Sequence, residues 1–309
     1  MAMAVGAAFA AVAAPAFGQL NPNAKRLWND YERLGPHKVF MLAPGGKAHT
    51  WSGASGADPG GAVERGLKFC EDKEKAKCTL FAVNNVVLNG RDWKAAAPPL
   101  LPPIGRLRPE PYSENKGPQA AAGLIVWSHG YFRGIDSTNS ALQGEVAYFT
   151  NAGYDLYRFD RQWIRDVQED AADFAAGLKQ AKSMGYKRII LAGQSNGAWT
   201  SLETVVRSPE VDGVISVSAA HHGEVKDMRD VSIARSDWQK LVRSIKPGPR
   251  VMVFIFKNDS YDVGGRTDDA TAAFKASAVD AIVVAYPPGF SGHGAASASA
   301  FPRKFGACI

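Results

Sequence analysis

One serine in this sequence stands where a nucleophile could be held for reaction. Ser195 lies in "RIILAGQSNGAWTSLE", residues 188–203, where an aliphatic run passes into a glycine-flanked serine and then into helix-forming residues. Gly193 and Gly197 allow a tight turn from a strand into a helix, which leaves the serine hydroxyl exposed at the edge of a sheet. A G-x-S-x-G pattern can occur by chance in a chain of this length. Its place between a strand and a helix makes it informative here.

The surrounding sequence predicts the sheet that this turn needs. From residue 120 onward, apolar runs typical of buried strands alternate with helix-like segments; the runs include "GLIVWSHG", "YDLYRF", "RIILAG", "GVISVSAA", "VMVFIF" and "DAIVVAYP". Strands separated by helices predict an α/β fold, with a mostly parallel sheet covered by helices on both faces. Ligands of such sheets bind beyond the carboxyl ends of the strands, which is where Ser195 follows "RIILAG".

On these residues the chain resembles the α/β-hydrolase superfamily, in particular its esterase and dienelactone-hydrolase-like branch with a G-Q-S-x-G turn. The resemblance covers the chain from about Gly123 to the end. It implies an α/β-hydrolase fold and a serine hydrolase that acts on a small-molecule ester. The chemistry it implies needs no metal and no organic cofactor.

The resemblance also selects a histidine. A serine hydroxyl is a poor nucleophile until a neighbouring base takes its proton. The family places its residues in the order nucleophile, acid, histidine. Three of the six histidines precede Ser195, while His221 and His222 precede the strongest candidates for the acid. His293, in the glycine-rich "PPGFSGHGAA", is therefore the expected base.

The acid should follow the penultimate strand, where it accepts a hydrogen bond from the imidazole. "VMVFIFKNDSYD" supplies Asp259 and Asp262, and the family spacing favours Asp259 with Asp262 as the alternative. Asp227 and Asp230 stay open as more remote alternatives, because some members of the family carry the acid one strand earlier.

Two backbone N–H groups are expected to bind the negative oxygen of the tetrahedral intermediate. Asn196, the residue after the serine, would supply one. "WSHGYFRG" resembles the His-Gly oxyanion loop of the family, so Tyr131 would supply the other. In this interpretation His129 and Gly130 shape the loop, and His129 is not the general base.

The first part of the sequence predicts a separate unit. Residues 19–94 combine strand-like "KVFMLAP", "KAHTW" and "CTLFAVNNVVL" with the amphipathic "GAVERGLKFCEDK", which indicates a small α+β module. Residues 95–119 are rich in proline and polar residues, which predicts an extended linker. Residues 120–309 would then form the catalytic domain.

The N-terminal residues and the cysteines predict the compartment. Residues 1–18 are small and apolar and end in a pattern suited to cleavage before Gln19, so we expect a secretory signal peptide and a periplasmic or secreted protein. Cys70 and Cys78 flank a polar turn and are predicted to form a disulfide, which an oxidising compartment would preserve. Cys308 is left without a partner.

Charge and hydropathy argue against two other kinds of partner. The formal net charge of +6 is spread along the chain and its basic residues do not alternate with aromatic ones, so no nucleic-acid site is expected. The mature chain contains no integral membrane segment in this interpretation. The sequence carries no signal for oligomeric state.

The expected function is a carboxylesterase that cleaves short to medium soluble esters through an acyl-enzyme on Ser195. The short chain between Ser195 and Asp259 leaves no room for a large lid, and aromatic residues near the strand ends could line a pocket: Tyr131, Trp163, Tyr261 and Phe290. Two alternatives stay open. A serine peptidase or acyltransferase would use the same groups, and a non-catalytic binding protein could keep the fold with the N-terminal module as its recognition element.

Overall fold

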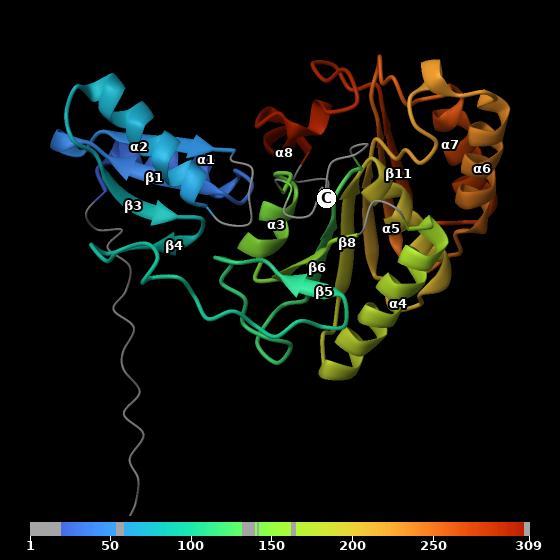
Figure 1. Ribbon diagram of the computed structural model, residues 1–309, viewed down its shortest axis with the longest axis horizontal. Coiled ribbons are helices and arrows are strands. Elements are labelled where there is room, and N and C mark those ends of the chain that lie inside the picture. Colours follow the sequence, from blue (N-terminus) through green and yellow to red (C-terminus); the bar gives the residue numbers. More distant parts are fainter. Residues whose placement is uncertain (1–19, 54–58, 132–139, 141, 162–164, 306–309) are drawn as a thin grey trace, which may run out of the picture.

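The computed structural model describes residues 20–53, 59–131, 140, 142–161 and 165–305. These residues form two units, one built on a four-stranded sheet and one on a seven-stranded sheet (Figure 1). The predicted signal peptide and Cys308 lie outside the described residues.

The N-terminal unit is a small sheet between two helices. All its strand pairs are antiparallel, in the order β2-β1-β3-β4. Helix α2 packs on one face through Val39 and Met41, and helix α1 packs on the other through Phe40. The elements are α1 (Pro22–Glu32), β1 (Lys38–Leu42), the 3-10 helix η2 (Pro44–Gly46), β2 (Ala48–Ser52), α2 (Gly60–Glu74), β3 (Thr79–Val83) and β4 (Val86–Val87).

Two details of this unit differ from the sequence-based expectation. Helix α1 was not predicted, although Asn21 caps it by accepting a hydrogen bond from the N–H of Ala24 and a proline begins its first turn. The stretch expected as one strand over residues 78–88 bends into the β3–β4 hairpin, because Asn84 adopts a positive φ of 49°.

The expected linker over residues 95–119 is more than an extended connector. Leu107–Pro109 form strand β5, which pairs antiparallel with β7 at the edge of the large sheet. Ile104 and Leu107 are fully buried there. These apolar side chains anchor the segment, and an edge strand tolerates the missing N–H of a proline.

The large sheet has the strand order β11-β10-β9-β8-β6-β7-β5, and every pair except β5–β7 is parallel. Its strands are β6 (Leu124–Ser128), β7 (Asp155–Phe159), β8 (Ile189–Gln194), β9 (Gly213–Val217), β10 (Arg250–Ile255) and β11 (Ala281–Ala285). The helices are α3 (Val146–Asn151), α4 (Val167–Met184), α5 (Asn196–Arg207), α6 (Val231–Ser244), α7 (Arg266–Ala276) and α8 (Ala300–Phe305), with 3-10 turns η3 (Val225–Asp227) and η4 (Ala295–Ser297).

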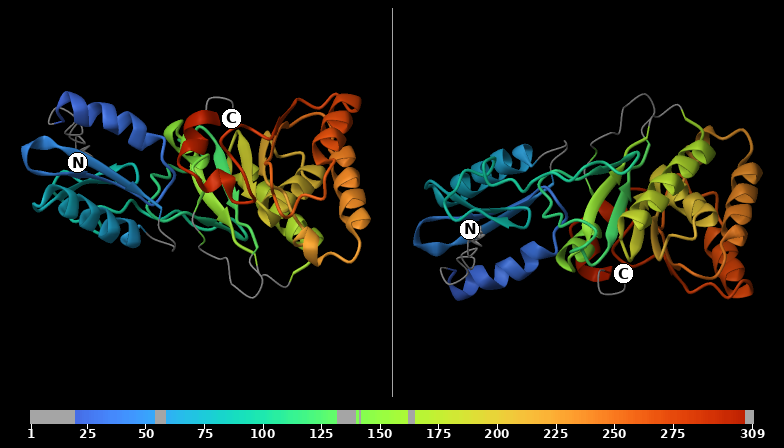
Figure 2. Two further views of the ribbon diagram at one scale, coloured as in Figure 1. Left: turned by 90° about the horizontal axis from the view of Figure 1, so that it is seen from above. Right: turned by 90° about the horizontal axis from the view of Figure 1, so that it is seen from below.

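Helices cover both faces of this sheet, as predicted. The core on one face contains side chains of α4, α5, α6 and α7, and the core on the other contains side chains of α3 and α8. Strand β7 lies on one side of β6 and β8 lies on the other, so the direction in which strands are added to the sheet reverses between β6 and β8. This arrangement is α/β-hydrolase-like. Figure 2 shows the small unit beside α3, with α6 and α7 at the far end of the molecule. Within the described ranges, no helix combines the length and apolar character that crossing a membrane requires.

The two units touch closely and share buried charge. A Cβ on Gly35 would lie 2.9 Å from the Cα of Gly144, so the backbones meet where a side chain would not fit. Glu110 contacts His37 of the small unit at 3.2 Å and Arg158 of β7 at 3.3 Å. All three side chains are at most 1% exposed, so separating the units would remove the buried contact of Glu110 with His37 and leave Glu110 paired with Arg158.

The structure contains the predicted Cys70–Cys78 disulfide, which joins the end of α2 to the start of β3.

Closing a loop of this size should stabilise the small unit by about 2–3 kcal/mol, because it restricts the unfolded chain. We expect a reducing agent to lower the free energy of unfolding by that amount, measured in urea. The Cys70→Ala/Cys78→Ala variant should already be destabilised and should not respond to the reductant; an equal response of both proteins would contradict this role.

A second stability prediction concerns Glu145, a fully buried carboxyl next to α3 whose oxygens accept no hydrogen bond from the described residues. Burial raises its pKa from 4.5 to about 8. The unfolded chain therefore loses this proton at a lower pH than the folded protein does. As a result, the free energy of unfolding falls as pH rises from 4.5 to about 8. We expect Glu145→Gln to gain at least ~2 kcal/mol over the wild type between pH 5 and pH 8 in urea unfolding. The exposed Glu64→Gln is the control, and a pH-independent difference for Glu145→Gln would contradict the prediction.

Candidate active site

The serine at the end of β8 sits on a strained turn. Ser195 has φ 57° and ψ −123°, a region that costs a residue with a side chain about 1–3 kcal/mol. Its N–H donates to the carbonyl of Val217, and its own carbonyl accepts from the N–H groups of Trp199 and Ala220. Strands β8 and β9 and helix α5 thus hold the turn in place.

The two flanking glycines are required by close contact rather than by their φ angles. A Cβ on Gly193 would lie 2.6 Å from the carbonyl group of Gly197. A Cβ on Gly197 would lie 2.0 Å from the carbonyl oxygen of Ser128, at the end of β6. The turn therefore packs directly against the loop after β6, as expected where β6 and β8 are neighbours.

Three of the selected side chains meet at this turn. His293 Nε2 lies 2.8 Å from Ser195 Oγ, and His293 Nδ1 lies 2.8 Å from Asp259 Oδ1. Asp259 follows β10 and His293 follows β11, and the side chain of Asp259 is only 3% exposed. The chain order is nucleophile, acid, histidine, and each distance allows proton transfer or a hydrogen bond.

The loops that carry the acid and the histidine are fastened to each other. The carbonyl of Lys257 accepts from the N–H of Gly292 and from the hydroxyl of Ser291. Asn258 donates to the same hydroxyl at 3.0 Å, and Gln194 donates to the carbonyl of His293 at 3.3 Å. These bonds hold residues 291–293 and bring the imidazole over the end of β8.

The alternative acids have other partners. Asp262 accepts from the N–H of Gly264 and lies 3.6 Å from Nε of Arg266. Asp230 caps α6 by accepting from the N–H of Ser232, and Asp227 lies in η3. Of the carboxyls considered, the structure brings Asp259 to His293.

The expected oxyanion donors lie on either side of the nucleophile. Asn196 is the first residue of α5, so its N–H belongs to the helix-terminal donors that find no acceptor within the helix. Tyr131 follows Gly130, where a Cβ would lie 3.3 Å from Cβ of Ser195. Gly130 thus lies close to the side chain of Ser195, and the role of the Tyr131 N–H stays a prediction.

His129 holds the Gly130–Tyr131 peptide in one orientation. Its Nε2 accepts a hydrogen bond from the N–H of Arg161 at 3.0 Å, so the ring proton must sit on Nδ1. Nδ1 then donates at 2.6 Å to the carbonyl of Gly130, which belongs to the same peptide as the N–H of Tyr131. Burial lowers the pKa of His129 to about 4, so the ring stays neutral above that pH.

Sequence reasoning missed Arg161. Its guanidinium donates to the carbonyl of His129, to the side-chain oxygen of Asn196 and to Thr200. It is 4% exposed, and burial lowers its pKa to about 10. Arg161 therefore joins the loop after β6 to the first turn of α5, the two segments that carry the expected oxyanion donors. A lone arginine after the "YDLYRF" strand carries no motif that would reveal this role.

The expected aromatic pocket is only partly present. The ring of Tyr261 lies 4.0 Å from the ring of His293 at an angle of 30°, so this residue covers the imidazole. Phe290 belongs to the core around α8 instead of a pocket. Tyr131 is 38% exposed, and Trp163 lies outside the described residues.

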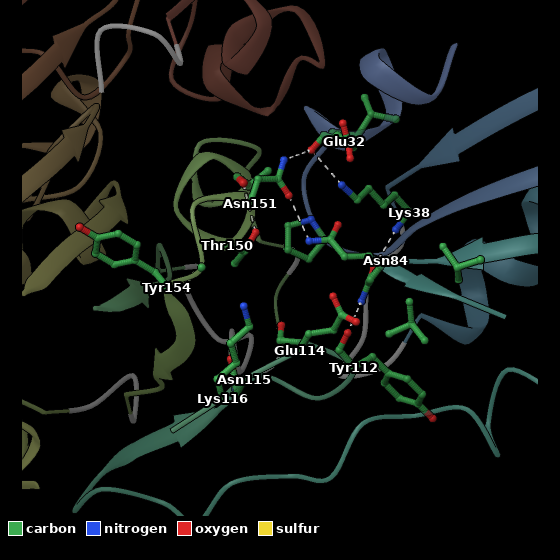
Figure 3. Close-up of a pocket in the computed structure, with 18 of the residues that line it drawn as sticks. Glu32, Lys38, Asn84, Tyr112, Glu114, Asn115, Lys116, Thr150, Asn151 and Tyr154 are labelled. Carbon is green, nitrogen blue, oxygen red and sulfur yellow. Dashed lines mark hydrogen bonds between the residues drawn. The ribbon is translucent and has the colours of Figure 1, made fainter. Parts of the chain in front are cut away.

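Two cavities lie between the small unit and the large domain. One, of about 620 Å³, includes Gly130 and Gln194 in its wall and so borders the catalytic loops. The other, of about 500 Å³, lies away from the triad and is shown in Figure 3. There Asn151 donates to the carbonyl of Glu32 and accepts from Asn85, so polar groups of the two units bind each other.

Comparison with known proteins gives remote structural matches alone. No protein-family model and no curated protein matches the sequence. An esterase of Pyrococcus furiosus is 15% identical over 61% of this chain and 78% of its own, with a TM-score of 0.47. A truncated carbohydrate esterase from gut microbiota is 14% identical over 65% and 88%, with a TM-score of 0.48. A puromycin-hydrolysing peptidase of Mycobacterium tuberculosis is 18% identical over 67% and 38%, with a TM-score of 0.46.

Arg161 can be tested through the reactivity of Ser195 toward a fluorophosphonate. Arg161→Met should slow covalent modification about ten- to a hundredfold. The reason is that the guanidinium would no longer join the two segments that carry the expected oxyanion donors. The measurement is the second-order labelling rate, with the melting temperature recorded beside it. Arg165→Met, which removes a guanidinium paired with Asp173 instead, is the matched control and should keep the wild-type rate. An unchanged rate for a folded Arg161→Met would refute the positioning role.

Proposed function

We propose that this protein is a serine hydrolase, most specifically a carboxylesterase that cleaves short to medium soluble esters. The observation that carries the proposal is the aligned contact of Ser195 Oγ, His293 and Asp259, at 2.8 Å for each hydrogen bond. The turn at Ser195 and the expected oxyanion donors support the same chemistry.

In the proposed reaction His293 Nε2 takes the proton of Ser195 Oγ as this oxygen attacks the ester carbonyl. The carbonyl oxygen becomes negative and is stabilised by the N–H groups of Asn196 and Tyr131. His293 then gives its proton to the departing alcohol, which leaves an acyl group on Ser195. A water molecule, deprotonated by the same imidazole, attacks the acyl group and releases the acid and the free serine. Asp259 stabilises the imidazolium that forms in both steps.

The proposed preference for small soluble esters rests on the chain around the site. Residues 195–259, all of which the structure describes, contain α5, β9, η3, α6 and β10 and no inserted lid domain. Of the aromatic residues expected to line an acyl pocket, Phe290 packs in the core around α8 and Tyr261 lies against His293. Among the described residues, these aromatic side chains therefore form no extended acyl pocket.

We further propose that the protein is exported to the periplasm or secreted. The Cys70–Cys78 disulfide supports this, because such bonds persist in oxidising compartments. Cell fractionation with N-terminal mass analysis tests it: export predicts a mature chain that begins at Gln19, and a full-length cytosolic protein would refute it.

The triad predicts a specific pattern of mutational loss. Ser195→Ala should abolish fluorophosphonate labelling and the hydrolysis of p-nitrophenyl acetate. Asp259→Asn should lower kcat by about 10³- to 10⁴-fold, because the imidazole loses the partner that fixes its tautomer and charge. Asp262→Asn, the neighbouring carboxyl that pairs with Arg266, should change kcat by less than about tenfold. Equal losses in the two aspartate variants, with both folded, would contradict the assignment.

Acyl length gives a separate test of the substrate class. The value of kcat/KM for p-nitrophenyl esters should fall by about tenfold or more between butyrate and palmitate, since the described aromatic residues form no extended acyl pocket for the longer chain. A detergent-matched series removes the effect of solubility. Equal or faster turnover of palmitate would reject the preference while leaving the serine mechanism in place.

A further inference from the structure

The cavity of about 620 Å³ is a cleft formed jointly by the small unit and the large domain. We call it the intermodule cleft. The small unit contributes Ser52 and Arg65 to its wall, and the large domain contributes Trp127, Gln143, Gln194 and Ser297, among others. Its volume suits a ligand of the size of one or two sugar rings.

The cleft ends at the catalytic loops. Gly130 and Gln194 line it, and they immediately precede Tyr131 and Ser195 in the chain. A Cβ on Gly130 would lie 2.6 Å from the side-chain oxygen of Gln194, so these two residues close the cleft together. The cleft therefore borders the two segments that carry the nucleophile and one expected oxyanion donor.

Polar groups in the wall lack partners within the protein. The side-chain oxygen of Gln143 accepts no hydrogen bond from any described residue, and its nitrogen makes only a 3.5 Å contact with Ser297. The indole N–H of Trp127 also donates to no described group. Both side chains are more than nine-tenths buried. A ligand in the cleft does not reach these two buried atoms directly. The hydroxyl-bearing side chains that it would meet include the half-buried Ser52 and the exposed Ser297 and Ser299.

The wall combines apolar side chains, which include Leu34, Leu142 and Pro302, with hydroxyl and amide groups. A sugar ring suits such a mixed wall, because it has hydroxyl groups and apolar C–H faces. Of the residues that line the cleft, Arg65 is the one with a charged side chain, and hydroxyl and amide side chains make up most of its polar part. A hydroxyl donates and accepts at once, as amide and serine side chains require. A long acyl chain would leave these groups without partners.

We propose that the intermodule cleft binds a polyhydroxylated, sugar-like part of the ester substrate and so determines its specificity. This inference rests on the proposed esterase function, and it gives the small unit a direct role in substrate recognition. The hydroxyls could belong to the alcohol or to the acid of the ester, and the test separates the two.

The test uses two pairs of substrates that match in ring size and differ in hydroxyls. The first pair is mono-acetylated methyl glucoside and cyclohexyl acetate, which places the ring on the alcohol. The second is the methyl ester of methyl glucuronoside and methyl cyclohexanecarboxylate, which places it on the acid. We expect kcat/KM to favour the hydroxylated member of one pair by at least about tenfold. The pair that shows the preference tells which side of the ester occupies the cleft.

Two variants connect this preference to the cleft. Gln143→Leu and Arg65→Ala should each lower the ratio of kcat/KM within the preferred pair by about fivefold or more. Lys68→Ala is the matched control, because it removes an exposed cation of the same helix that does not line the cleft. This control should keep the wild-type ratio.

The outcomes separate the cleft from the catalytic mechanism. No preference in either pair, or a preference that both variants leave intact, would overturn the proposal even if fluorophosphonate labels Ser195. If no ester is cleaved and no label is incorporated, the esterase function fails instead. Binding in the cleft is then measured by saturation-transfer NMR with methyl glucoside and the Ser195→Ala protein. A signal that the additional Gln143→Leu substitution removes supports the proposal. An absent signal, or one that this substitution leaves unchanged, refutes the proposal.

Discussion

The backbone of Ser195 is the constraint on which the rest of the site depends. A serine at φ 57° and ψ −123° persists because the surrounding structure allows no relaxed alternative. The N–H of the serine is held by Val217 of β9, and Gly197 lies against the end of β6. Such a turn can form only if β6, β8 and β9 are already adjacent, so the parallel sheet and the strained residue are one arrangement.

The same adjacency explains how the negative oxygen would be stabilised. The loops after β6 and β8 lie side by side at the chain reversal, and the N–H groups of Tyr131 and Asn196 come one from each. A neutral His129 orients the first peptide, and the buried Arg161 joins both segments. The guanidinium keeps its charge at neutral pH despite burial, because a pKa lowered to about 10 still lies well above 7. The charged form that makes its hydrogen bonds is therefore present at neutral pH.

The sequence predicted those parts of the molecule that depend on local pattern or chain order. The alternating strands and helices, the Cys70–Cys78 pair and the turn at Ser195 are visible in short stretches, and the order of residues selects His293. Arg161 and strand β5 were not predicted, because each acquires its role from contacts between distant segments. Arg161 meets Asn196 across 35 positions, and β5 is defined by its pairing with β7. The cleft between the units depends on their relative placement, about which periodicity says nothing.

The small unit is best understood as part of the framework of the site. Its His37 meets Glu110, Glu110 meets Arg158, and Arg158 lies 3.3 Å from Asp160, the residue before Arg161. Withdrawing the small unit would remove the contact of His37 with Glu110 and would open the wall of the intermodule cleft at the same time. The stability of the fold and the proposed recognition would thus depend on one interface, which gives a physical reason for the unit to pack beside α3.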